Sequence, residues 1–252
     1  MYSLSKLTDK PLPLITLGLI LVNVIIHILV FTSPNPEAIL STYGEHPTEI
    51  VRGLDLHTLF TSMFLHGGPL HIFGNMLYLA VFGILTEQRL GHSRFLILYL
   101  LAGLGAALIA DWVAVSYLNV TSEHYAIGAS GAIGGALGAC LLGFPLARVP
   151  APLLFLFLWF LTPLMGGLVF LLSGMLFLFL IVYTFTMKVP AIILLSLWFV
   201  EQFLIAMTIL GWAAWAHLGG FMVGGVLYLI LKKGEEPTKK PSEWEIPSMA
   251  PR

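Results

Sequence analysis

Ser130 and His217 are the two side chains of this sequence that are best suited to chemistry. Ser130 lies in the run Gly128-Ala129-Ser130-Gly131, and His217 lies in the apolar stretch Trp212–Leu231. A serine hydroxyl is a weak nucleophile until a base within hydrogen-bond reach takes its proton, and histidine suits that task near neutral pH. A serine among small residues can also simply let another helix approach. Ser130 is therefore either a nucleophile or a packing residue, and His217 favours the first role.

Attack on a carbonyl also requires hydrogen-bond donors for the oxyanion that forms. The backbone N–H of Ser130 is one candidate, because the first N–H groups of a helix have no intrahelical acceptor. His71 and Asn75 are four residues apart, so in a helix they share one face and can donate from the side. No carboxylate occurs at a comparable depth in the helices that carry these residues. The pattern predicts a Ser–His dyad without an acidic third member.

The composition places these residues in a membrane protein. Of 252 residues, 58% are hydrophobic and only 10% are charged, whereas a soluble domain carries about 25% charged residues. Uncharged runs long enough to cross a bilayer recur along the chain. The net charge of −1 does not indicate a nucleic-acid partner, and the single cysteine, Cys140, excludes an internal disulfide. We therefore predict an all-α, multi-pass helical bundle surrounded by membrane lipid.

Six helices are predicted to form the core of this bundle. They are Leu12–Thr32, Leu70–Leu85, Phe95–Leu118, Ile127–Leu146, Ala191–Leu210 and Trp212–Leu231. Lysines before the first helix and after the last one predict that both termini are cytoplasmic, because basic residues favour that side. The first helix is long for a cleavable signal and no Ala-x-Ala-like site follows it, so we expect it to be retained. In this topology His71, Ser130 and His217 all lie within about 10 Å of the outer ends of their helices, which predicts a site near the outer face of a cell membrane.

Residues 1–231 are predicted to form one membrane domain with an insertion at about residues 149–187. The insertion contains the uncharged run Ala151–Met187, which Pro163 and Gly166-Gly167 interrupt. It must cross the membrane an even number of times if the flanking basic residues are to stay on one side. We therefore expect an extra hydrophobic hairpin or re-entrant segment between the fourth and fifth helices.

Two further segments are predicted to lie outside the bundle. The tail, residues 232–252, is charged and proline-rich, and we expect it to be disordered. The apolar run Leu59–Leu65 is too short to span a membrane, so we expect it to lie along the membrane surface.

Small residues line both helices that carry the candidate dyad. One stripe holds Ser130, Gly134 and Gly138, with Gly131 and Gly135 beside it, and the other holds His217, Gly220 and Gly224. Such stripes let two helix backbones pack closely. If the two helices meet along them, Ser130 and His217 lie side by side.

Taken together, these motifs resemble the rhomboid family of intramembrane serine proteases. The matching residues are Gly128-Ala129-Ser130-Gly131, His71-x-x-x-Asn75 preceded by His66, and Ala216-His217-x-x-Gly220, with similar stretches at Thr61–His66, Glu87–Gly91 and Arg94-Phe95. They occur in the family's order between Phe60 and Gly224. The resemblance implies that Ser130 is the nucleophile and His217 the general base. It also implies that His71 and Asn75, with the Ser130 amide, are the oxyanion donors.

The resemblance implies several further properties. Structural support comes from His66, Gly128, Gly131, Gly220 and Gly224. The substrates are membrane proteins cut in or near a transmembrane helix, and the helix at 191–210 is the lateral gate. No cofactor and no metal are implied, and the oligomeric state is left open.

The sequence departs from the family pattern at three places. Many members have an aromatic residue four positions after the serine that stacks on the histidine, but here that position is Gly134. Another ring would then have to hold His217. The Trp-Arg often found in the first outer loop is replaced by His57-Thr58, and the insertion at Ala151–Met187 is additional.

Three other functions are compatible with parts of the pattern. A catalytically silent rhomboid-like protein would bind membrane helices, although silent relatives usually lack the serine or the histidine, and both are present here. A metalloprotease would use several of the histidines, but no His-Glu-x-x-His motif occurs. A transporter would suit the broken helices, yet no inverted repeat is visible and intramembrane charges are few.

Overall fold

The computed structural model describes residues 11–150, 188–208 and 211–232, and their secondary structure is almost entirely helical. The helices are α1 (Leu14–Phe31), α2 (Pro36–Tyr43), α3 (Pro47–Val51), α4 (Thr58–Thr61), α5 (Pro69–Tyr78), α6 (Ile84–Leu90), α7 (His92–Ser116), α8 (Ser130–Gly143), α11 (Ala191–Ala206) and α12 (Trp212–Leu231). A 3₁₀ turn (Ser62–Phe64) follows α4, a π-helical turn (Leu79–Gly83) joins α5 to α6, and the two short strands are β1 (Arg148–Pro150) and β2 (Lys188–Pro190). The prediction of a helical protein is therefore confirmed.

The chain divides into two compact units. The first comprises residues 1–143 and 201–236, and the second comprises residues 144–200 and 237–252. All the candidate site residues predicted from the sequence belong to the first unit.

Four helices in the described part of the chain are long and apolar enough to cross a membrane. They are Leu14–Phe31, the continuous helix Pro69–Leu90, His92–Ser116 and Trp212–Leu231. The helices Ser130–Gly143 and Ala191–Ala206 are apolar but shorter. The multi-pass character is thus supported by these four spans, while a core of six membrane-crossing helices remains a prediction.

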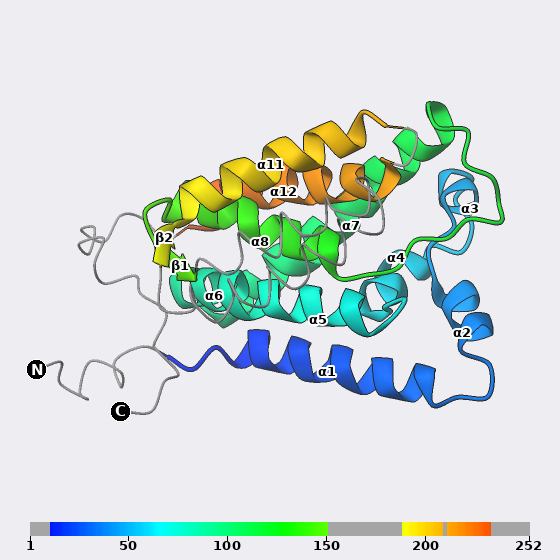
Figure 1. Ribbon diagram of the computed structural model, residues 1–252, viewed down its shortest axis with the longest axis horizontal. Helices are drawn as coiled ribbons and strands as arrows, with labels where there is room; N and C mark the ends of the chain where they lie inside the picture. The colour runs from blue at the N-terminus through cyan, green and yellow to red at the C-terminus, as the bar shows by residue number, and fades with distance from the viewer. Residues whose placement is uncertain (1–10, 151–187, 209–210, 233–252) are drawn as a thin grey trace, which may run out of the picture. The chain divides into compact units, whose positions relative to one another are not determined.

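Three helices, α7, α8 and α12, pack against one another and form the centre of the first unit. Helix α1 runs along the lower edge of Figure 1, where it contacts α5 and α6. The buried side chains of α7 are mostly small, including Ala102, Ala106 and Ala110. Small residues here allow α8 and α12 to lie close to α7.

Glycines bring the backbones of α8 and α12 into direct contact. A Cβ atom on Gly220 would collide with the Gly131 carbonyl, and one on Gly224 would collide with the Gly135 backbone. We call these four residues, Gly131, Gly135, Gly220 and Gly224, the glycine seam. Because no side chain separates the two helices along the seam, residues at its end are held at a short and fixed separation.

The second predicted helix is longer than the sequence suggested, because polar residues that resemble a loop are part of it. The continuous helix ends at Leu90 rather than Leu85. Glu87 is buried, and its carboxylate accepts hydrogen bonds from the backbone N–H groups of Ile15 and Thr16 and from the Thr16 hydroxyl. A buried carboxylate with these donors is satisfied, so Glu87 fastens the start of α1 to the end of α6.

The short helices between α1 and α5 pack against other helices of the first unit. Leu59, Met63 and Leu65 are buried, whereas Phe60 is 47% exposed, so the placement of Leu59–Leu65 along a membrane surface stays a prediction. The buried residues of this segment contact the protein core, because Leu65 packs against Val30 and Leu40, and Leu59 packs against Ile50 and Ala107.

The described part of the second unit consists of a small antiparallel strand pair and the start of α11. Arg148 pairs with Pro190 and Val149 with Val189, and the Ala191 amide donates to the Ala147 carbonyl. The predicted hairpin or re-entrant segment at Ala151–Met187 lies outside the described residues. The predicted disordered tail does so as well, apart from Lys232.

Candidate active site

The backbone before α8 sets the position of Ser130. Helix α8 begins at Ser130, three residues later than the sequence suggested. Gly128 has a backbone φ of +132°, which residues with a side chain rarely adopt. Its amide donates to the Ser62 carbonyl at 2.9 Å. This geometry prevents helix formation at Ile127 and makes Ser130 the first helical residue, with its N–H free of any intrahelical acceptor.

His217 lies beside Ser130 at the end of the glycine seam. The imidazole Nε2 is 2.8 Å from the Ser130 Oγ, which is within hydrogen-bond distance. His217 is in the second turn of α12, and Gly220 follows it at the first contact of the seam. The structure therefore brings together the two side chains that the sequence selected from separate helices.

The other ring nitrogen of His217 is bound by a residue that the sequence reasoning missed. His217 Nδ1 is 2.6 Å from the Gln202 Oε1, and Gln202 Nε2 donates to the Glu201 carboxylate at 3.0 Å. Both Gln202 and Glu201 are buried. The signal available in the sequence was the pair of polar residues inside the apolar helix Ala191–Leu210. An amide therefore holds His217 at Nδ1, and the expectation of a supporting ring stays a prediction.

His71 and Asn75 lie on α5, which contacts α8. The His71 Nδ1 accepts a hydrogen bond from the Gly67 amide at 3.3 Å, and the Asn75 Nδ2 donates to the His71 carbonyl at 3.1 Å. A Cβ on Gly128 would stand 3.0 Å from the His71 Nε2 and 3.7 Å from the Ser130 Oγ. The missing Cβ therefore leaves a space that the His71 Nε2 and the Ser130 hydroxyl both border.

His66 is a fully buried neighbour of this site. Only 1% of its surface is exposed, and its ring makes an edge contact with His71 at a centroid distance of 5.1 Å. Burial, with His71 and His27 nearby, lowers the pKa of His66 to about 3. A neutral, buried ring packed against His71 fits a supporting role.

A small cavity of about 70 Å³ opens beside Ser130. Its lining includes Glu45, Ser62 and Gly128. The backbones of Glu45 and Ala126 exchange two hydrogen bonds, of 2.9 and 2.7 Å. We call Glu45, Ser62, Ala126 and Gly128 the loop cluster, because they join the segments that precede α3, α5 and α8.

Glu45 is the buried acid of the loop cluster. Its side chain is 4% exposed, and it lies beside Asp111 of α7 and near the Ser62 hydroxyl. Burial, and the negative charge of Asp111, raise the pKa of Glu45 well above the usual carboxyl range. Burial therefore favours the neutral form of the Glu45 carboxyl group.

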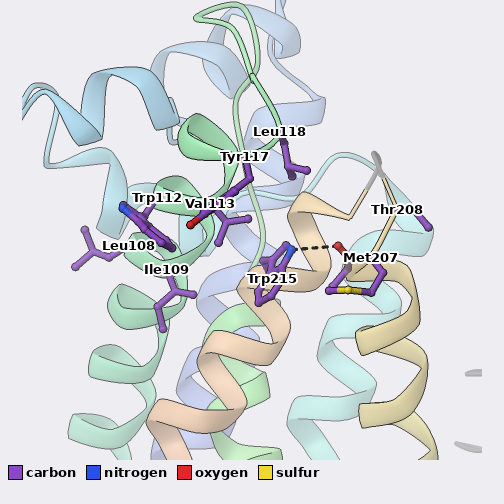
Figure 2. Close-up of a pocket in the computed structure, with 10 residues that line it drawn as sticks. Leu108, Ile109, Trp112, Val113, Tyr117, Leu118, Met207, Thr208 and Trp215 are labelled. Carbon is purple, nitrogen blue, oxygen red and sulfur yellow. Dashed lines mark hydrogen bonds between the residues drawn. The ribbon is translucent and has the colours of Figure 1, made fainter.

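A larger cavity, of about 800 Å³, lies at the C-terminal end of α7 (Figure 2). Trp112, Tyr117, Met207 and Trp215 are among the side chains around it. The Trp215 indole N–H donates to the Ala206 carbonyl at 3.1 Å and so links the end of α11 to the first turn of α12. None of the candidate site residues lines this apolar cavity.

The described residues offer no group of three or more His, Cys, Asp or Glu side chains that could hold a metal ion.

Comparison with known proteins gives the family. The family model of the Rhomboid domain matches residues 53–234, well over half of the chain. The chain belongs to the rhomboid family. The match includes every candidate site residue of this rhomboid, and with the four apolar helices it identifies an integral membrane protein.

Curated relatives include proteases as well as rhomboid-like proteins. The chain is 34% identical over 140 residues to "Rhomboid protease AarA" of Providencia stuartii, which covers 51% of this chain and 50% of the relative. It is 33% identical over 109 residues to "Rhomboid protease GluP" of Bacillus subtilis, and the match covers 43% of this chain and 20% of the relative. It is 34% identical over 93 residues to "RHOMBOID-like protein 6, mitochondrial" of Arabidopsis thaliana, and the match covers 37% of this chain and 28% of the relative. The chain thus spans at most about half the length of these relatives.

Proposed function

We propose that this rhomboid is an intramembrane serine endopeptidase that cleaves transmembrane-helix substrates through a Ser130–His217 dyad. The observation that carries the proposal is the 2.8 Å approach of the His217 Nε2 to the Ser130 Oγ. Two relatives that are named as rhomboid proteases support the reaction class.

Formation of the acyl-enzyme follows from this geometry. The Ser130 Oγ attacks the carbonyl carbon of the scissile peptide bond while the His217 Nε2 takes the hydroxyl proton. The carbonyl oxygen becomes an oxyanion. When the C–N bond breaks, the imidazolium returns the proton to the leaving amine. Serine and the substrate acyl group are then joined as an ester.

Hydrolysis of the ester reverses the proton path. Water attacks the ester carbonyl while the His217 Nε2 takes a proton from it, and the second tetrahedral intermediate collapses with return of that proton to the Ser130 Oγ. The substrate leaves as a carboxylic acid. The dyad is regenerated, and no metal or cofactor enters either step.

The oxyanion donors are the Ser130 amide, His71 and Asn75. The Ser130 amide lies at the N-terminus of α8, where the helix dipole also favours negative charge. The space beside Gly128, which borders both the His71 Nε2 and the Ser130 Oγ, suits a carbonyl oxygen under attack. Asn75 retains a second amide hydrogen besides the one that it gives to the His71 carbonyl.

The site is proposed to lie near the outer face of the membrane, with both termini cytoplasmic. The distribution of lysines in the sequence supports this orientation. The substrates, membrane proteins with a helix that unwinds near the site, meet the protein within the lipid bilayer.

Cleavage of a reconstituted transmembrane-helix substrate tests the proposal. Ser130→Ala removes the nucleophile, so cleavage should fall below detection while the purified protein stays folded. Ser116→Ala, which removes an exposed hydroxyl at the end of α7, is the matched control and should cleave normally. Undiminished cleavage by Ser130→Ala would refute the assignment, and no cleavage by wild type would favour the silent helix-binding alternative.

A further inference from the structure

The imidazole of His217 has to be held in one orientation and one tautomer if it is to act as a base. Only an unprotonated Nε2 can accept the Ser130 proton, so the single hydrogen of the neutral ring must be on Nδ1. The proposed function therefore requires an acceptor at Nδ1.

Helix α8 cannot supply this support from the position one turn after Ser130. A Cβ on Gly134 would stand 2.8 Å from the His217 carbonyl oxygen and 3.3 Å from the Phe221 amide nitrogen. The backbone of α12 fills the space beside Gly134, so a ring at this position would push the two helices apart.

Gln202 of α11 contacts the His217 Nδ1 instead. Its Oε1 lies at 2.6 Å, and an amide oxygen can only accept a hydrogen bond. This contact requires the hydrogen on Nδ1 and so leaves Nε2 unprotonated toward the Ser130 Oγ, 2.8 Å away. Gln202 is buried, with 7% of its surface exposed, so little water competes for the contact.

Glu201 determines which end of the Gln202 amide faces the histidine. The Gln202 Nε2 donates to the Glu201 Oε2 at 3.0 Å, so the oxygen of the amide points to His217. While Glu201 is ionised, the reverse orientation would set the amide oxygen against its carboxylate, which is repulsive. Glu201, Gln202, His217 and Ser130 thus form one chain of hydrogen bonds in which each donor has a defined direction.

We propose that Gln202 is the positioning residue of the dyad, which fixes the orientation and tautomer of His217, and that Glu201 fixes the Gln202 amide. This inference rests on the proposed function. In this arrangement the neutral amide of Gln202 stands where a serine-protease triad has a carboxylate, and its oxygen accepts the same Nδ1 hydrogen.

The test uses the full-length protein in lipid and the rate of labelling by a fluorophosphonate probe between pH 5 and pH 9. Gln202→Met keeps the side-chain volume but removes the strong acceptor. Loss of one hydrogen bond lowers the fraction of His217 in the reactive orientation and tautomer, so labelling at neutral pH should slow by about tenfold. The imidazolium also loses a stabilising contact, so the fall in rate at low pH should move to lower pH.

Gln202→Glu is the conservative variant. It keeps an acceptor at Nδ1, so labelling at neutral pH should stay within about threefold of wild type. The added carboxyl favours the imidazolium, so the fall in rate should move to higher pH. Among the described residues, His71 of α5 and Glu201 of α11 are titratable groups near His217, and both are unchanged in this pair of variants.

Trp215→Phe is the control for packing between α11 and α12. It removes the hydrogen bond from the indole to the Ala206 carbonyl without touching His217. Thermal stability should fall, while the shape of the pH profile should match that of wild type.

The role of Gln202 would be overturned if Gln202→Met labelled within twofold of wild type, or if both Gln202 variants slowed equally at every pH with an unshifted profile. The failure of the proposed function looks different. In that case wild type and Ser130→Ala would be labelled alike, whatever residue stands at position 202.

Discussion

Two regions hold Ser130 in place, and they differ in how they do so. The glycine seam joins α8 to α12 by backbone contact and determines the separation of Ser130 from His217. The loop cluster joins three loops through a few hydrogen bonds and the buried carboxyl of Glu45, and it determines where α8 begins. The seam is a repeat within two helices, whereas the cluster is built from segments far apart in the sequence.

The comparison predicts two kinds of sensitivity. Close backbone contact leaves no room for a side chain, so the seam should respond to the volume of a substituent and not to pH. A buried acid beside a second acid responds to protonation, so the loop cluster should respond to pH. Each region can therefore be perturbed without directly altering the chemistry of the other.

The largest effect is expected in the seam. Gly224→Ala places a Cβ against the Gly135 backbone, so α8 and α12 must separate. Such overpacking costs about 1–3 kcal/mol of stability, and labelling of Ser130 by a fluorophosphonate should slow because His217 moves with α12. Thermal unfolding and labelling rate measure the two consequences.

Gly18→Ala is the matched control for that substitution. Gly18 lies in the second turn of α1, and a Cβ there would meet no neighbouring atom within 4 Å. Alanine favours a helix over glycine by about 1 kcal/mol, so this variant should be at least as stable as wild type and label normally. Equal destabilisation of the two variants would mean that the seam has no special role.

A smaller, pH-dependent effect is expected in the loop cluster. Because the pKa of Glu45 is raised in the folded protein, its neutral form stabilises the fold at low pH. That contribution decreases as pH rises above the ordinary glutamate range toward the raised pKa. Wild type should thus lose thermal stability toward pH 9, and Glu45→Gln, which cannot ionise, should lose less by on the order of 1 kcal/mol for each pH unit in that range.

The pH dependence has a clear negative result. If thermal unfolding of wild type and Glu45→Gln changed in parallel from pH 5 to pH 9, Glu45 would not be the titrating group of the loop cluster. Gly224→Ala should keep the wild-type pH dependence while its overall stability is lower, which separates the two regions.

Much of the seam and of its helices could be predicted from the sequence. The helix Trp212–Leu231 was predicted with its observed bounds, because an apolar run with clear polar limits determines a span. The glycine stripes have the four-residue spacing that places side chains on one helix face. Ser130 and His217 are found at the same end of these stripes, so their meeting followed from local periodicity.

The remaining parts depend on long-range contacts that periodicity does not encode. Glu87 resembled a loop residue because its donors, Ile15 and Thr16, lie far away in the sequence. The start of α8 depends on the bond from the Gly128 amide to the Ser62 carbonyl. Gln202 was visible only as a polar residue in an apolar helix, because the sequence does not fix how α11 is rotated toward α12.

Labelling of the purified protein by a fluorophosphonate probe tests the central claim most directly, since it requires no knowledge of the substrate. Wild type should be labelled at Ser130, and His217→Ala should fall to background because the hydroxyl then has no base to take its proton. Equal labelling of wild type and His217→Ala would contradict the dyad.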